Sequence, residues 1–205
     1  MVKDGFRFAL PPLLIGIVLM ILRWWWGAIF LALGLFVLYF FRDPKRRIPT
    51  EPGAVVSPAD GRVVEIADEP LDGRAGRRIS IFLSVFDVHV NRAPVAGQVR
   101  RIDYHAGKFL AAWKEKASSA NEQNSITIAT PAGEMRFKQI AGWVARRILC
   151  WTRIGDEVTL GQRIGMIRFG SRVDVWLPAE AEILVQRGQH VAGGATQIAR
   201  WQFTK

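Results

Sequence analysis

Residues 8–41 constrain the fold most, because they are almost wholly apolar. Residues 8–22 (FALPPLLIGIVLMIL) and 24–41 (WWWGAIFLALGLFVLYFF) form two runs separated only by Arg23. At ~1.5 Å per residue, the first run of 15 residues is short for the hydrocarbon core, and the second run of 18 is just long enough. The pattern predicts an apolar helical hairpin that anchors the chain, with a shallow re-entrant anchor as the alternative.

The charges around these runs indicate an orientation. Lys3 and Arg7 precede the first run, and the basic segment 42–47 (RDPKRR) follows the second. By the positive-inside rule both ends face the cytoplasm, with Trp24–Trp26 at the far interface. A cleaved signal peptide fits poorly, because there are two runs and no small-residue cleavage site. The expected location is therefore the cell membrane, with the folded domain on its cytoplasmic face.

The chain carries a net charge of +10, which indicates an anionic partner. Basic residues just beyond an apolar anchor each gain roughly 1 kcal/mol at an anionic lipid surface. The sequence has no recognition helix, zinc finger or aromatic RNA platform. We therefore expect an anionic phospholipid membrane as partner and no nucleic acid.

Residues 48–205 have the composition of a soluble domain, following an anchoring segment over residues 1–47. Short β-branched runs alternate with Gly, Pro, Asp and Asn about every ten residues, which predicts a mainly β barrel or sandwich. Two turns, GDEVTLG (155–161) and GQHVAGG (188–194), share a Gly-x-x-Val-x-x-Gly spacing typical of compact hybrid-motif β folds. One or two short helices are expected, from residues 107–124 and, ambiguously, 144–151.

The cysteine and histidines favour metal-free chemistry. The single Cys150 excludes an internal disulfide and a Cys-rich zinc site, and its apolar neighbours predict a small core residue. The three histidines, His89, His105 and His190, are too far apart in sequence to suggest a metal cluster. No metal is expected.

A Gly–Ser pair interrupts the strand pattern RIGMIRFGSRVDVWLP (163–178). Glycine inside a strand often marks a bulge or a bend, which is the simplest reading of Gly170. The pair is also small, flexible and nucleophilic, so a reactive Ser171 is the alternative.

Several segments taken together are similar to the shorter, membrane-anchored branch of the phosphatidylserine decarboxylase family. They run in order along nearly the whole chain: FFRDPKRRIP (40–49), SPADGRV (57–63), SIFLSVFDVHVNRAP (80–94), IAGWVARRI (140–148), GQRIGMI (161–167) and IRFGSRVD (167–174).

The resemblance implies a proenzyme that cuts itself between Gly170 and Ser171. Chain 1–170 and a small chain of 35 residues, 171–205, would form a heterodimer, and Ser171 would become a covalent pyruvoyl cofactor. The pyruvoyl carbonyl would form a Schiff base with the serine amine of phosphatidylserine, accept the electrons released with carbon dioxide, and leave phosphatidylethanolamine.

The resemblance also implies an acid–base group. His89 lies in the matching motif and has the side chain best suited to proton transfer near neutral pH. Asp60 matches the aspartate that orients this base, in an Asp–His–Ser arrangement. The longer branch carries a second histidine where this chain has Arg92, so His89 takes both roles, or Asp87 or a substrate group fills the gap. Arg92 either binds the lipid phosphate or is a solvated surface residue.

Two alternatives share these residues. The same chemistry could act on an archaeal-type ether phosphatidylserine, because the catalytic residues contact only the headgroup. The chain could instead be a silent, membrane-anchored lipid-binding β module. A homo-oligomer stays open in every case.

Overall fold

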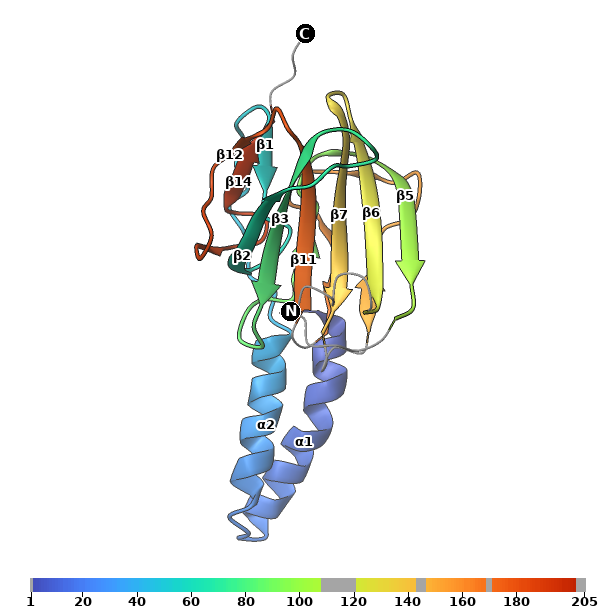
Figure 1. Cartoon of the computed structure of the whole chain (residues 1–205). Helices are drawn as coiled ribbons and strands as arrows, with labels where there is room; N and C mark the ends of the chain where they lie inside the picture. Colours follow the sequence, from blue (N-terminus) through green and yellow to red (C-terminus); the bar gives the residue numbers. More distant parts are fainter. Residues whose placement is uncertain (1, 108–120, 143–146, 169–170, 202–205) are drawn as a thin grey trace. The chain divides into compact units, whose positions relative to one another are not determined.

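The computed structural model describes residues 2–107, 121–142, 147–168 and 171–201. The chain divides into two units, Met1–Lys45 and Arg46–Lys205. The first unit is a pair of helices and the second is built of β-strands (Figure 1).

The helical unit consists of α1 (Lys3–Ile21) and α2 (Gly27–Phe40), joined by a tight turn. The glycines let the helices approach closely: a Cβ at Gly16 would lie 2.8 Å from the backbone nitrogen of Leu31, and one at Gly34 would lie 2.5 Å from the Cγ of Leu13. Small residues at such a contact are typical of helices packed in a membrane.

The outward surface of this unit is apolar, with side chains such as Ile21 and Leu35 at least 60% exposed. Among the described residues, α1 alone is long and apolar enough to cross a bilayer, and α2 is shorter. The prediction that the second run is the longer span was wrong. Arg23 takes a left-handed conformation (φ 61°) and Trp24–Trp26 belong to the turn, so α2 begins only at Gly27.

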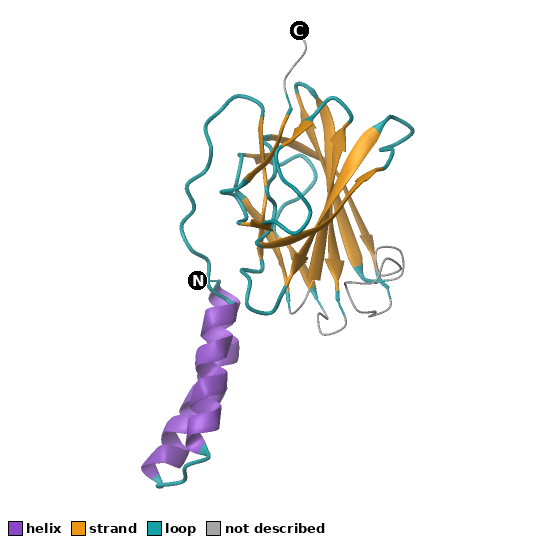
Figure 2. Ribbon diagram, turned by 60° about the vertical axis from the view of Figure 1, so that its left-hand side comes forward, coloured by secondary structure: helices purple, strands orange, loops and turns teal. Residues whose placement is uncertain are grey.

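A large, entirely antiparallel sheet forms the body of the second unit and curls into a half-barrel (Figure 2). Its eight strands, in spatial order, are β13 (His190–Val191), β2 (Gly61–Asp68), β3 (Gly76–Leu83), β11 (Ser171–Pro178), β7 (Gly133–Ala141), β6 (Gln123–Thr130), β5 (Gly97–His105) and β9 (Glu157–Val158).

Two three-stranded sheets accompany the half-barrel. The first has the order β1 (Ala54–Val56), β14 (Gln197–Arg200), β12 (Glu182–Ile183), and the second β4 (Val90–Arg92), β10 (Arg163–Ile167), β8 (Ile148–Cys150). Alternate apolar side chains of the large sheet, such as Ile81, Phe137 and Val173, form one buried core with residues of the small sheets. The predicted mainly β fold with its N-terminal apolar helices is confirmed.

Two local predictions differ from the structure. Of the helix expected over 107–124, residues 108–120 lie outside the described residues, and Gln123 and Asn124 begin β6. The placement of Cys150 in the core was wrong, because it is exposed at the end of the edge strand β8, where only Ile148 faces inward.

Candidate active site

Ser171 is the first residue of β11, a central strand of the large sheet (Figure 1). It pairs with Leu83 of β3 on one side and with Ala141 of β7 on the other. The side chain is fully buried, and its Oγ has no hydrogen-bond partner among the described residues. Gly170 lies outside the described residues. A buried hydroxyl without a partner is costly to keep, which marks Ser171 as a functional candidate.

His89 is held at the same end of the sheet by the connection after β3. Within that connection, the Ser84 backbone N–H and hydroxyl donate to the Asp87 carboxylate (2.8 and 2.7 Å). The fully buried His89 ring bonds through Nδ1 to the Asp87 carbonyl at 2.9 Å. Because a carbonyl only accepts, Nδ1 carries the proton, and Nε2 of the neutral ring is the basic nitrogen.

The backbone of His89 lies beside the segment that leads to Ser171. Its carbonyl accepts a hydrogen bond from the N–H of Ile167, the last residue of β10 (3.3 Å). Since Ser171 follows Ile167 by four residues, topology brings the candidate base and nucleophile to one end of the domain. The Ser171 hydroxyl is not hydrogen-bonded to His89 in this structure. Catalytic hydrogen bonds often tighten only as the reaction proceeds.

Asp60 is held in a separate set of contacts. Its carboxylate pairs with Arg46 Nη2 at 2.8 Å from both oxygens and accepts the Gly193 N–H at 2.7 Å. Both side chains of the pair are 13% exposed. These bonds tie the start of the β unit to the turn before β14, and they fix the carboxylate in place.

Arg92 lies on β4 and is partly buried, so it is not a fully solvated surface residue. Its Nη1 donates to the Gly161 carbonyl at 3.0 Å. Exposed His190 donates from Nε2 to Asp87 Oδ1 (3.0 Å), a contact that the sequence did not reveal. Asp87 thus supports His89 through its carbonyl and contacts Ser84 and His190 through its carboxylate.

The interior at this end of the domain is unusually polar. Asn91, Asn124 and Gln139 are buried with Ser171 and His89 among the core residues, although they come from different strands. Burying such groups is unfavourable unless they are hydrogen-bonded. Sequence patterns did not identify these amides, because they lie within otherwise ordinary strands.

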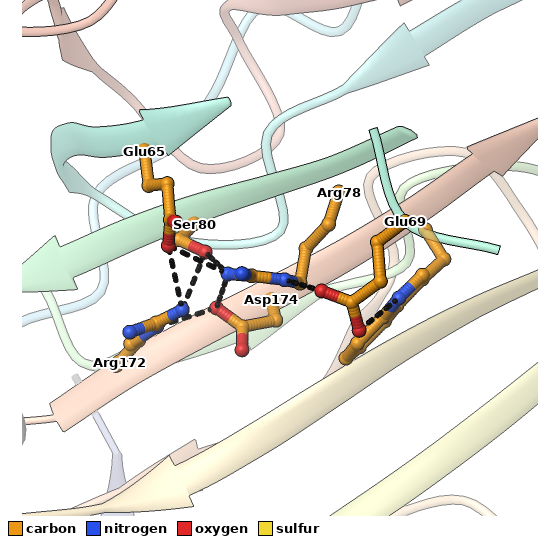
Figure 3. Close-up of polar contacts among 7 residues, drawn as sticks. Glu65, Glu69, Arg78, Ser80, Arg172 and Asp174 are labelled. Atoms are coloured by element: carbon orange, nitrogen blue, oxygen red, sulfur yellow. Dashed lines mark hydrogen bonds and ion pairs between the residues drawn. The ribbon is translucent and has the colours of Figure 1, made fainter. Parts of the chain in front are cut away.

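A buried ion cluster lies on the other face of β11, immediately after Ser171 (Figure 3). Arg172 donates from Nε to Asp174 Oδ1 at 2.6 Å and from Nη2 to Ser80 Oγ at 2.7 Å. Arg78 donates to Glu65 at 2.9 Å and also contacts Ser80.

The cluster has electrostatic consequences. The hydrogen bond from Arg78 holds the pKa of Glu65 below its ordinary value, while burial lowers the pKa of Lys138 on the neighbouring strand β7. Since Arg172 and Asp174 are both buried, the cluster anchors the residue that directly follows Ser171.

Among the described residues, no group of three or more His, Cys, Asp or Glu side chains could hold a metal ion. The polar groups described above are instead those of proton transfer and hydrogen bonding.

Comparison with known proteins defines the class. The model of the family "Phosphatidylserine decarboxylase" matches residues 33–199. Three relatives have the name "Phosphatidylserine decarboxylase proenzyme". That of Symbiobacterium thermophilum is 46% identical over 97% of this chain and 94% of its own. That of Carboxydothermus hydrogenoformans is 45% identical over 98% of this chain and 96% of its own. That of Solibacter usitatus is 50% identical over 88% of this chain and 88% of its own.

These matches place the chain among the decarboxylases that are made as self-processing proenzymes. It belongs to the phosphatidylserine decarboxylase family.

Proposed function

We propose that this protein converts phosphatidylserine to phosphatidylethanolamine, using a pyruvoyl group made from Ser171 when the chain cuts itself after Gly170. The observation that carries the proposal is Ser171 itself. In a chain of a proenzyme family, its hydroxyl is fully buried, has no partner among the described residues, and follows directly on the Gly–Ser bond.

The self-cleavage needs only groups of this chain and one water molecule. The Ser171 hydroxyl adds to the Gly170 carbonyl while His89 Nε2 takes its proton, and breakage of the C–N bond turns the amide into an ester. In the elimination a base removes the Cα proton of residue 171, its electrons form the Cα–Cβ double bond, and the Cβ–Oγ bond breaks, leaving a carboxylate on Gly170 and a dehydroalanine at position 171. Hydrolysis releases ammonia and leaves the pyruvoyl group.

His89 and Asp60 have distinct roles in this proposal. His89 can act as base because the Asp87 carbonyl fixes the proton on Nδ1. Asp60 contributes to orienting this base, as the resemblance implies, and its own position is fixed by Arg46 and the Gly193 N–H.

A pyruvoyl group at position 171 supplies the carbonyl that accepts the electrons released with carbon dioxide. The residues around it bind and orient. Strand pairing on both sides of β11 holds position 171 in place, and the Arg172 cluster anchors the next residue. His89 returns a proton to the substrate carbon, and Arg92 binds the lipid phosphate.

The helical unit supports a place at the cell membrane, with the β unit on the cytoplasmic face. Its outward side chains are apolar, and basic residues lie at both ends of the hairpin. The substrate is itself a membrane lipid, so an anchored enzyme meets it without extracting it into water.

Intact-mass spectrometry under denaturing conditions tests the cleavage. We expect two species, split between residues 170 and 171, with the small one lighter by one ammonia than a chain beginning with serine. Ser171→Ala should give one uncut mass. A wild-type chain that stays in one piece, or a cut Ser171→Ala chain, would contradict the mechanism.

A second experiment tests the substrate. Mixed vesicles containing either ester-linked or ether-linked phosphatidylserine are supplied to the purified full-length enzyme, and carbon dioxide release is measured. We expect turnover of the ester lipid that is lost in Ser171→Ala. Turnover of the ether lipid alone would assign the alternative substrate, and a cut chain active on neither would contradict the proposed activity.

A further inference from the structure

Three buried side-chain amides form a chain across the interior at the Ser171 end of the domain. Asn124 Nδ2 of β6 donates to Gln139 Oε1 of β7 at 2.9 Å. Gln139 Nε2 donates in turn to Asn91 Oδ1 of β4 at 2.8 Å. All three are at most 2% exposed. In each bond the amide N–H donates to the oxygen of the next amide, so the series of hydrogen bonds runs from Asn124 through Gln139 and ends at Asn91.

The Nδ2 group of Asn91 is the free end of this chain. It is buried and has no hydrogen-bond partner among the described residues. The bond from Gln139 fixes the amide plane, because it occupies the oxygen and leaves both N–H bonds of Nδ2 as donors. Buried donors without partners are rare in folded proteins and require an explanation.

Strand pairing locates this donor near Ser171. Gln139 pairs with Val173, and the next pair on the same face of the sheet is Ala141 with Ser171. A glycine makes the crossing to Asn91 feasible, since a Cβ at Gly165 of β10 would lie 2.9 Å from Gln139 Nε2. The absence of a side chain at Gly165 therefore leaves room for the Gln139 amide to reach Asn91. The strand pair that contains Gln139 is next, on the same face of the sheet, to the pair that contains Ser171.

The same strand relates Asn91 to His89. Gly165 pairs with Asn91, and Ile167 donates to the His89 carbonyl, so the pairing of β4 with β10 extends to His89. Residues two apart along a strand face the same side. We therefore expect the side chains of Asn91 and His89 on the same side of this segment, the side on which Asn91 meets Gln139 of β7.

We propose that the Asn91 side-chain amide stabilises the oxyanion formed at Gly170 during self-cleavage, a role that rests on the proposed function above. As Ser171 Oγ bonds to the carbonyl carbon, the carbon–oxygen π electrons move onto the oxygen. The hydroxyl proton goes to His89. Asn91 Nδ2 then donates to the negative oxygen until the C–N bond breaks. Gln139 is a positioning residue that aims the donor through Asn91 Oδ1.

A donor held in place before the reaction gains strength as charge develops on its acceptor, without reorganisation. Removing one such donor typically slows the step about 100- to 1,000-fold. The absence of a ground-state partner among the described residues fits this role, since a donor already engaged elsewhere would first have to be released.

The test uses the full-length chain made by cell-free synthesis into detergent micelles, with samples stopped over time and analysed by intact mass. Asn91→Asp keeps the size of the side chain and the acceptor for Gln139 but removes the N–H donors. We expect its cleavage to be about 100- to 1,000-fold slower at neutral pH. Gln139→Glu should also slow cleavage, because its carboxylate accepts from Asn91 and captures the donor.

A matched control removes another buried polar group. Thr127 is 4% exposed, and its hydroxyl has no partner among the described residues, but it lies on the opposite face of β6 from Asn124. Thr127→Val should cleave at the wild-type rate. Urea midpoints of all variants, measured in a Ser171→Ala background, show whether each has folded.

Two further readouts identify the affected step. Hydroxylamine cleaves an ester but not the amide, so Asn91→Asp should release little cleaved chain, whereas a block at the elimination step would release much. When protonated, the introduced carboxyl has an O–H donor. Both chains lose the base when His89 is protonated, so the test is the ratio of their rates: cleavage of Asn91→Asp relative to wild type should rise as the pH falls.

Cleavage of Asn91→Asp within about threefold of wild type would overturn the inference, as would equal slowing by Thr127→Val or accumulation of a hydroxylamine-sensitive ester. Should Asn91→Asp fail to fold, Gln139→Glu decides in its place, and normal cleavage of that variant overturns the inference. An uncut wild-type chain would contradict the proposed function itself. A cut wild type with normally cut variants would refute only the role of Asn91.

Discussion

The pair Arg172–Asp174 allows a quantitative test of how the strand after Ser171 is stabilised. The two side chains are 5% and 1% exposed and are joined at 2.6 Å. Removing one partner of a buried pair leaves an uncompensated charge and costs about 3–5 kcal/mol, whereas replacing both by apolar residues is often close to neutral. The single variants Arg172→Leu and Asp174→Leu should therefore each lower the free energy of unfolding strongly. The sum of these two losses should far exceed the loss in the double variant.

The contacts predict which single variant is worse. Without Asp174, Arg172 keeps Ser80 at 2.7 Å and Glu65 at 3.4 Å. Without Arg172, the cation that the described part of the chain still places within 4.0 Å of Asp174 is Arg78. Arg172→Leu should consequently lie near the upper end of the range, about 5 kcal/mol, and Asp174→Leu near about 3 kcal/mol.

Urea unfolding of the full-length chain in detergent measures these costs. A Ser171→Ala background keeps every sample in one covalent form, and the midpoint at an unchanged denaturant slope reports the free energy of unfolding. The exposed pair Arg101–Asp103 has the same 2.6 Å separation, so Arg101→Leu is the control and should change the midpoint far less. Single costs that add to the double within about 0.5 kcal/mol would refute coupling in the cluster.

Three further changes test the site. His89→Gln keeps the volume of the side chain but removes the base, so the chain should stay uncut by intact mass, and normal cleavage would exclude His89 as the base. Asp60→Asn and Arg46→Gln should lower the urea midpoint similarly, because each breaks the same pair. Asp60→Asn should slow cleavage more, because in Arg46→Gln the carboxylate remains and still accepts the Gly193 N–H. Equal cleavage rates would leave Asp60 a structural role alone. The pKa of Glu65 is lowered by the hydrogen bond from Arg78, so folding favours its ionised form. Its contribution should be present above pH 4.5 and be lost as the pH falls through the lowered pKa. Melting temperatures of wild type and Glu65→Gln should then converge in acid, and a constant difference would contradict this linkage.

Local patterns were sufficient for the fold class. Alternating β-branched segments with regular Gly, Pro and Asp breaks predicted strands, and the structure has them. The apolar runs predicted the two helices, but their lengths depended on the backbone of Arg23, which hydropathy does not report.

Long-range pairing is what the sequence could not show. The alternating segment SRVDVW suggests a strand with one polar, open face, yet Arg172 and Asp174 are as buried as Val173. The reason is that side chains from β2 and β3, including Glu65 and Arg78, cover that face. Those strands lie about a hundred residues away along the chain, and no local signal records their contact.

The candidate site shows the same division. Ser171 and His89 lie in short motifs and could be singled out by residue type and resemblance. The amides Asn91, Asn124 and Gln139 could not, because each acts only through a partner on another strand. Their common property, burial without apolar character, exists only after folding.

Ser171 is the first residue of a central strand, so the proposed cut before it would leave the strand, and with it the candidate site, in place. The proposed cut between residues 170 and 171 would fall just before the first residue of β11, which would remain paired from Ser171 to Pro178 with β3 and from Ser171 to Trp176 with β7. Residues 171–177 are all buried, and Arg172 is anchored by its ion cluster. The new chain end therefore cannot leave without breaking two ladders and exposing core residues. A reactive group formed at position 171 by the proposed cut would thus be held in place by the same pairing that holds the serine in the uncut chain.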